Sequence, residues 1–212
     1  MIRILVADDH TVVREGVKQI LSTQNDIVVG DEAEDGKETL EKALRGSFDM
    51  VLLDISMPGR GGLEILEDIL KSKPKLPVLI LSMHPEEQYA VRALRAGASG
   101  YLTKASAAHE LVGAIRKVSR GGKYVTASLA EKLAVALDSK ADKHRHEKLS
   151  TREYQVMLML ASGKSVGEIA HELCLSVKTI STYRIRVMNK MGMKKNAELT
   201  FYAMNHRLID PY

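Results

Sequence analysis

Short apolar runs alternate with amphipathic stretches over the first 120 residues, and this alternation limits the fold more than any other feature. Each apolar run is followed by a segment whose apolar residues recur every three or four positions. Runs this continuously apolar are typical of parallel strands buried between two layers of helices. The pattern predicts a doubly wound, five-stranded parallel α/β sheet. The strands are expected at 2–7, 27–30, 50–54, 77–82 and 100–104, and the helices at 11–22, 36–46, 62–72, 86–96 and 107–120.

Polar residues stand where four of the five predicted strands end. Asp8 and Asp9 follow the first strand, Asp54 ends the third, Ser82 the fourth and Lys104 the fifth. The carboxyl ends of parallel strands lie at one edge of the sheet, where α/β proteins bind ligands. Each residue alone has a simpler explanation, as a helix cap or a solvated charge. Their convergence favours a polar site.

Three carboxylates at one edge of a sheet repel one another. Either their pKa values rise or a hard divalent cation lies among them. Oxygen-only ligands favour Mg²⁺. A metal ion among acids, with a lysine and a hydroxyl nearby, suits a phosphoryl group, whose oxygens need charge neutralisation and hydrogen bonds.

Positive charge is concentrated in the last third of the chain. Residues 1–120 carry 16 basic and 18 acidic side chains, whereas residues 148–212 carry 10 basic and 5 acidic ones. The net charge is therefore −2 over the first stretch and +5 over the second. This asymmetry suggests a nucleic-acid-binding surface near the C-terminus.

A linker is expected between these two stretches. Gly121 and Gly122 stop the last helix of the sheet domain, and residues 128–137 predict a short amphipathic helix. The charged stretch 139–148 contains Ala141 as its one apolar residue, so we expect it not to pack. The two histidines of this stretch, His144 and His146, are expected to be solvated rather than to bind a metal.

Residues 149–212 are too few for another α/β layer and predict four helices. Ser150 with Glu153, and Ser165 with Glu168, form two capping boxes, and Ser176 predicts a third helix start. A turn over residues 174–177 separates two of the helices, which indicates a helix-turn-helix. The second of these helices presents basic and hydroxyl side chains that suit phosphates and base edges of DNA, although a merely solvated basic helix has the same composition.

The N-terminus and the single cysteine bear on location. Acids occur too early in the chain for a signal peptide, and no apolar run approaches the roughly 20 residues of a membrane span. We expect a cytoplasmic protein without a membrane partner. Cys174 excludes an internal disulfide and is expected to be a small buried residue.

Residues 1 to about 120 resemble the receiver domain of two-component response regulators. The resemblance rests on Asp8-Asp9, on Asp54 followed by Pro58 and Gly62, on Ser82, and on the run 96–104. Two positions depart from the usual pattern. Met83 is bulky where many receivers have a small residue, and Ala105 stands where many have the proline that permits a cis bond after the lysine.

This resemblance implies a flavodoxin-like fold and a phosphorylation site. It implies that Asp54 accepts a phosphoryl group from a sensor histidine kinase and that Asp8, Asp9, Asp54 and the backbone carbonyl of Ser56 hold Mg²⁺. Ser82 and Lys104 would bind the phosphoryl oxygens. Tyr101 matches an aromatic position that swings inward as the serine closes on the phosphate.

The C-terminal region resembles the LuxR-type helix-turn-helix. The matching segments are 149–153, 160–163, 168–170, 175–176, 178–180 and 190–192, together with Leu173. Ser181 stands where many members have a DNA-contacting lysine, so the base preference of this chain is expected to differ. By position, Ser181, Thr182 and Ile185 would face bases. The residues expected to face phosphates or to stabilise the helix are Lys178, Thr179, Arg184, Arg186 and Lys190.

Together these resemblances predict a response regulator of the NarL/FixJ group, with a receiver at 1–120, a linker at 121–148 and a DNA-binding domain at 149–212. The expected partners are a sensor histidine kinase, double-stranded promoter DNA and, when phosphorylated or DNA-bound, a second copy in a homodimer. Two alternatives stay open. A phosphatase of the haloacid dehalogenase type would want an acid where Ser56 stands, and a regulator that binds DNA without phosphorylation would not need all the acids retained here. We expect no enzyme activity.

Overall fold

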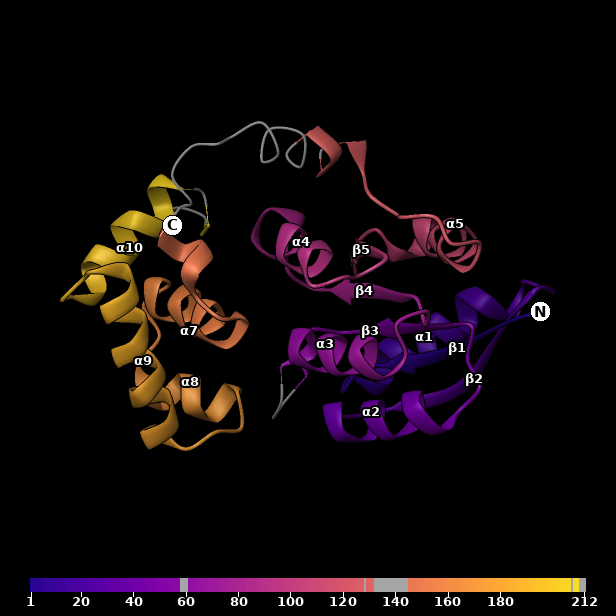
Figure 1. Ribbon diagram of the computed structural model, residues 1–212, viewed down its shortest axis with the longest axis horizontal. Helices are drawn as coiled ribbons and strands as arrows, with labels where there is room; N and C mark the ends of the chain where they lie inside the picture. The colour runs from indigo at the N-terminus through magenta and orange to yellow at the C-terminus, as the bar shows by residue number, and fades with distance from the viewer. Residues whose placement is uncertain (58–60, 128, 132–144, 207, 210–212) are drawn as a thin grey trace. The chain divides into compact units, whose positions relative to one another are not determined.

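The chain forms two compact units, Met1–Ala134 and Val135–Tyr212. The structure is a computed structural model that describes residues 1–57, 61–127, 129–131, 145–206 and 208–209 (Figure 1). Over these ranges no helix is long and apolar enough to cross a membrane.

The first unit is a five-stranded parallel sheet in the order β2-β1-β3-β4-β5, which confirms the predicted fold class. This order is the flavodoxin-like one, in which the switch point lies between β1 and β3. Most predicted boundaries agree within a residue, but β2 is longer than expected. The elements are β1 (Ile2–Ala7), α1 (Thr11–Ser22), β2 (Ile27–Ala33), α2 (Gly36–Arg45), β3 (Met50–Leu53), α3 (Gly62–Ser72), β4 (Val78–Ser82), α4 (Glu86–Arg95), β5 (Gly100–Thr103) and α5 (Ala107–Ser119).

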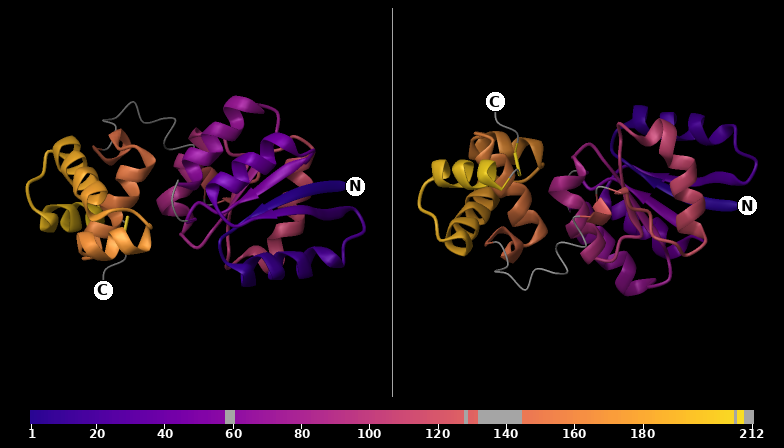
Figure 2. Two further views of the ribbon diagram at one scale, coloured as in Figure 1. Left: turned by 90° about the horizontal axis from the view of Figure 1, so that it is seen from below. Right: turned by 90° about the horizontal axis from the view of Figure 1, so that it is seen from above.

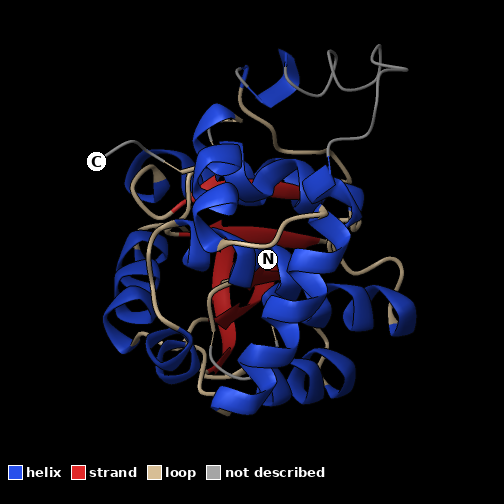
Figure 3. Cartoon of the chain, turned by 90° about the vertical axis from the view of Figure 1, so that its left-hand side faces the viewer, coloured by secondary structure: helices blue, strands red, loops and turns tan. Residues whose placement is uncertain are grey.

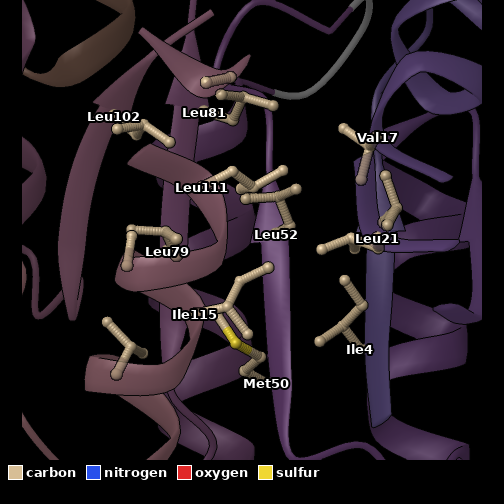
Figure 4. Close-up of a cluster of buried hydrophobic side chains, with 14 of the residues drawn as sticks. Ile4, Val17, Leu21, Met50, Leu52, Leu79, Leu81, Leu102, Leu111 and Ile115 are labelled. Carbon is tan, nitrogen blue, oxygen red and sulfur yellow. The ribbon is translucent and has the colours of Figure 1, made fainter. Parts of the chain in front are cut away.

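Helices cover both faces of this sheet (Figures 2 and 3). Right-handed crossovers place α1 and α5 on one face and α2, α3 and α4 on the other. On the first face, Val17 and Leu21 of α1 and Leu111 and Ile115 of α5 pack against strand residues such as Leu52 (Figure 4). All four residues of β3 are buried, as its continuous apolar run predicts. This core fixes the strand ends that carry the polar residues.

The chain stays attached to the sheet after α5. The N–H of Tyr124 donates to the carbonyl of Ser99 at 2.8 Å, and the hydroxyl of Thr126 donates to a Glu86 carboxylate oxygen at 2.6 Å. A side chain at Gly100 would lie 2.7 Å from the carbonyl oxygen of Tyr124, so this close approach requires glycine. Tyr124 and Thr126 of the predicted linker therefore bind the start of the edge strand and the start of α4, respectively. Of the helix predicted at 128–137, residues 129–131 are helical and the rest lies outside the described residues.

The second unit is helical, with the predicted helix-turn-helix. Its elements are the 3₁₀-helix η1 (Arg145–Lys148) and the helices α7 (Thr151–Ala161), α8 (Val166–Glu172), α9 (Val177–Met191) and α10 (Asn196–Asn205). Both capping boxes are present, and Ser176 caps α9. Helix α9 packs against α7 and α8, and α10 packs against α7. Cys174 in the turn is exposed and has a φ of 52°, so our expectation of a buried cysteine was wrong.

The end of the predicted linker also differs from expectation. Residues 145–148 contact α9 although they contain no apolar side chain. Nη1 of Arg145 donates to the carbonyl of Met191 at 3.1 Å, and Nδ1 of His146 lies 2.9 Å from the hydroxyl of Tyr202. Hydrogen bonds to groups of the helical unit hold this segment in place. His146 is therefore partly buried rather than solvated, whereas His144 lies outside the described residues.

Candidate functional site

The sheet brings the predicted polar residues to one edge. Ala7 pairs with Leu53 in register, so the residues that follow them, Asp8 and Asp54, emerge side by side from β1 and β3. Ser82 pairs with Thr103, which places Lys104 beside the end of β4. The N–H of Lys104 donates to the Ser82 carbonyl at 2.7 Å. Strand register thus brings together side chains that are far apart in the sequence.

A lysine ammonium joins two buried carboxylates at this edge. Nζ of Lys104 lies 2.7 Å from Oδ2 of Asp54 and 2.7 Å from Oδ2 of Asp8. The side chains of Lys104, Asp54 and Asp8 are 7%, 0% and 2% exposed, respectively. Water screens these charges little, so their interaction is much stronger than that of a surface ion pair.

Burial and charge oppose each other in setting the protonation of this pair. Burial raises the pKa of Asp54 above its usual value, although the hydrogen bond and positive charge of Lys104 lower it. For Lys104 burial would lower the pKa, but hydrogen bonds and negative charge from Asp54 and Asp8 outweigh burial and raise it. Lys104 is therefore held as a cation.

The loop after β3 holds the Asp54 carboxylate in place. The N–H of Ser56 donates to Oδ1 of Asp54 at 2.8 Å. Gly62 at the start of α3 lies against this loop, and a Cβ atom there would be 2.5 Å from the carbonyl oxygen of Asp54. Only glycine allows α3 to begin so close to the site.

The acids at this edge fit a divalent cation. One ligand atom each from Asp8, Asp9, His10 and Asp54 lies within 4.8 Å of the others. Oδ2 of Asp8 and Oδ1 of Asp9 are shielded from solvent, and among the described residues they contact the Lys104 ammonium and the His10 ring, respectively. One ammonium faces three carboxylates, so the site retains negative charge. The carboxylate oxygens suit the predicted Mg²⁺. His10, whose Nδ1 lies 3.0 Å from Oδ1 of Asp9, was not predicted from the sequence to be part of this site.

The switch residues of the sequence prediction lie beside this site. Ser82 is fully buried, and its hydroxyl oxygen accepts a hydrogen bond from the N–H of His84 at 3.1 Å. Tyr101 is also fully buried and donates its hydroxyl to the carbonyl of His84 at 2.8 Å. The tyrosine ring is thus already inward. The Met83 side chain is 70% exposed and points into solvent, and no peptide bond of the described residues is cis, including the one after Lys104.

Helix α9 presents the second candidate site. Lys178, Thr182, Ile185 and Arg186 are exposed, whereas Ile180 and Val187, among others, form the buried stripe. Ile185 is 58% exposed and Val177 is 57% exposed, so two apolar side chains lie among the exposed polar ones of this helix. A helix face of this kind, with cations beside apolar groups, suits the phosphates and base edges of a DNA major groove.

Some residues predicted to contact DNA have partners within the protein. Nε of Arg184 donates to the side-chain oxygen of Asn196 at 3.0 Å, which ties α9 to α10. Nζ of Lys190 lies 2.6 Å from a carboxylate oxygen of buried Glu153. Thr179 binds the capping Ser176 through both its N–H and its hydroxyl, and Ser181 is partly buried.

Comparison with known proteins identifies the family. The model of the response regulator receiver domain matches residues 4–116, and that of bacterial regulatory proteins of the luxR family matches residues 147–203. The chain belongs to the two-component response regulators. Response regulator GacA of Pseudomonas viridiflava is 38% identical over 211 residues, which is 99% of both chains, and response regulator UvrY of Escherichia coli K12 is 37% identical, covering 99% of this chain and 97% of UvrY.

Solved structures agree with this assignment. RcsB from Salmonella enterica serovar Typhimurium, bound to promoter rprA in the presence of phosphomimetic BeF₃⁻, superimposes with a TM-score of 0.65 and 26% identity. The alignment covers 96% of this chain and 99% of RcsB. This response regulator is a transcription regulator of the NarL/FixJ group, as its sequence predicted.

Two further residues of this response regulator were not foreseen from the sequence. Val177 lies on the exposed face of α9, and an apolar residue outside the buried stripe was the available signal. Arg14 of α1 is 5% exposed and reaches the backbone of Asp8. Arg14 lies on the buried face of α1 with Val17 and Leu21. A charged residue in this apolar stripe was the sequence feature that could have indicated a buried role.

Proposed function

We propose that phosphorylation of Asp54 by a sensor histidine kinase switches this response regulator and that the switch controls its binding to promoter DNA as a homodimer. The observation that carries the proposal is the buried Asp54 carboxylate, bonded to Lys104 and next to two further carboxylates. A transferred phosphoryl group needs such a cation, and the acids give a divalent ion its ligands.

The chemistry is a phosphoryl transfer between side chains. A carboxylate oxygen of Asp54 attacks the phosphorus of a phosphohistidine on the kinase, so that an O–P bond forms, the N–P bond breaks and the electron pair returns to the imidazole. Lys104 then exchanges its bond to Asp54 for one to a phosphoryl oxygen. Asp8, Asp9, Asp54 and the Ser56 carbonyl would hold Mg²⁺, which neutralises charge on the phosphoryl oxygens.

Ser82 connects the phosphoryl group to the neighbouring loop. Its hydroxyl oxygen accepts from His84, so its own O–H is available to donate to a phosphoryl oxygen. A serine drawn toward the phosphate would pull His84 with it, and the carbonyl of His84 holds the Tyr101 hydroxyl. Phosphorylation of Asp54 would therefore reach the buried Tyr101 through the carbonyl of His84.

The exposed face of α9 is the proposed DNA-binding surface. Lys178 and Arg186 would contact phosphates, while Thr182 and the apolar Ile185, supported by Val177, would contact base edges. Apolar side chains suit the thymine methyl group in the major groove. Arg184, Lys190 and Thr179 have bonding partners within the unit and would orient α9. Ser181, which is partly buried, would lie at the edge of the DNA-binding surface.

The relatives support DNA binding and dimerisation. RcsB, a structural neighbour, has been solved bound to a promoter and as two dimers bound to two parallel DNAs. We place this regulator in the cytoplasm, where a kinase domain and chromosomal DNA are both accessible. The residue two positions after Asp54 is Ser56 rather than a second acid, which favours a regulator over a haloacid dehalogenase-type phosphatase.

Phosphorylation by a small phosphodonor in Mg²⁺ tests the site. The wild type should acquire one phosphoryl group, and Asp54→Ala should acquire none. Chelation of Mg²⁺ should abolish labelling of the wild type. Intact-mass spectrometry measures the product, and equal labelling of Asp54→Ala would refute the assignment.

A further inference from the structure

Arg14 is a buried cation close to the acidic site. Its Nη1 donates to the backbone carbonyl of Asp8 at 2.8 Å and its Nε to Glu32 at 3.0 Å, while Nη2 binds the carboxylate of Glu34. The Arg14 side chain is only 6% exposed. A buried charge is costly unless it is paired and hydrogen-bonded, so these partners fix where the guanidinium lies.

The carbonyl that Arg14 binds lies between the two acids Asp8 and Asp9. The C=O of Asp8 is part of the planar unit that joins Asp8 to Asp9, so its direction influences both side chains. In the preceding peptide, the N–H of Asp8 donates to the carbonyl of Ala33 at 3.0 Å. The peptide before Asp8 is therefore held by the end of β2, and the peptide between the two acids is held by Arg14 of α1.

We infer that Arg14 is a positioning residue that directs the carboxylates of Asp8 and Asp9 toward a divalent cation. This inference rests on the proposed function, which assigns both acids to the ion. Arg14 itself does not contact the ion. It acts through the Asp8 carbonyl, in the way that outer hydrogen bonds orient metal ligands in general.

Charge alone makes the opposite prediction. Replacing Arg14 by a neutral residue removes a positive charge near the acids and leaves Glu32 and Glu34 without this partner. More negative surroundings attract a cation more strongly. Weaker ion binding after the replacement would therefore reveal positioning and not electrostatics.

The test is calorimetric titration of the full chain with MgCl₂, which needs no phosphorylation. Arg14→Met should weaken Mg²⁺ binding about tenfold. Lys18→Met is the matched control, because the Lys18 ammonium lies 2.7 Å from the same Glu32 and on the same helix. It should change the affinity by less than about twofold. Unchanged or tighter binding by Arg14→Met, or equal weakening in both variants, would overturn the inference.

A second variant covers the case in which Arg14→Met does not fold. Arg14→Lys keeps the charge but replaces a planar fork of donors by one ammonium, so it should bind Mg²⁺ more weakly than the wild type. Circular dichroism checks the fold, and full affinity in a folded Arg14→Lys would refute the role of Arg14. If the wild type itself shows no saturable Mg²⁺ binding, the proposed ion site fails instead.

Discussion

The receiver edge and the exposed face of α9 both depend on charged side chains but handle them in opposite ways. Lys104 is 7% exposed and is bonded to two carboxylates, whereas Lys178 and Arg186 extend into solvent. Burial makes the receiver charges strongly interdependent, so one added phosphoryl group would disturb all of them. Exposure leaves the charges of α9 available to phosphates of DNA. The two regions therefore suit a switch and an output, respectively.

The largest effect is expected where a buried cation is removed. Lys104→Met should lower the free energy of unfolding of the receiver by about 3 to 5 kcal/mol in a chelator, because Asp8 and Asp54 lose their counter-charge. Added Mg²⁺ should restore some of the loss. Urea unfolding measures both effects. Lys71→Met removes a surface lysine that is 71% exposed and should cost less than about 1 kcal/mol. Equal losses of unfolding free energy in the two variants would contradict the special role of the buried lysine.

Removal of an exposed cation should affect DNA binding instead of stability. Lys178→Met should leave the free energy of unfolding within about 0.5 kcal/mol of the wild type. Its affinity for DNA should fall, and the slope of log affinity against log salt should decrease by about 1. Fluorescence anisotropy at several salt concentrations measures this slope. Lys190→Met is the comparison: because Lys190 is ion-paired with Glu153, this variant should lose stability. An unchanged salt slope for Lys178→Met would contradict the assignment of Lys178 to a DNA phosphate.

A smaller effect is expected from the apolar side chains of the same face. On a DNA site selected from a random pool, replacing contacted thymines by uracil removes only methyl groups, and each should cost the wild type about 0.8 kcal/mol. Ile185→Ala should show little preference between the two DNAs. The four affinities form a double-mutant cycle, and a preference that survives Ile185→Ala would assign the methyl contact elsewhere.

The smallest effect is a difference in pH dependence. Burial raises the pKa of Asp54 above its usual 3.8, so the folded state takes up its proton first, and the stability contributed by Asp54 rises as pH falls from the raised pKa toward 3.8. Burial opposes the trend at Glu153, but Lys190 and Ser150 outweigh it and lower the pKa below 4.5. Its contribution is present above pH 4.5 and is lost as pH falls through the lowered pKa.

Urea titrations between pH 7 and 4 in a chelator separate these contributions. As pH falls, the free energy of unfolding of the wild type should increase relative to that of Asp54→Asn. Over the same range it should decrease relative to that of Glu153→Gln. Parallel curves for the two pairs would show that the two carboxyl groups do not differ in this way.

The sequence predicted the fold and the gathering of Asp8, Asp54 and Lys104, because strand order follows from the apolar runs and every parallel strand ends at the same edge. It also predicted the capping boxes, which are local patterns. The ion pair between Lys190 and Glu153 and the contact of Arg14 with Asp8 were not foreseen. Both depend on how helices pack against their neighbours, which the local spacing of residues does not specify.

We propose above all that the state of Asp54 controls DNA binding. The direct measurement is the affinity of the full chain for a selected DNA site, with and without beryllium fluoride and Mg²⁺, for the wild type and Asp54→Ala. We predict that the phosphoryl mimic raises the affinity of the wild type and leaves that of Asp54→Ala unchanged. Equal affinity of the wild type in both conditions, or an equal response of Asp54→Ala, would contradict the claim.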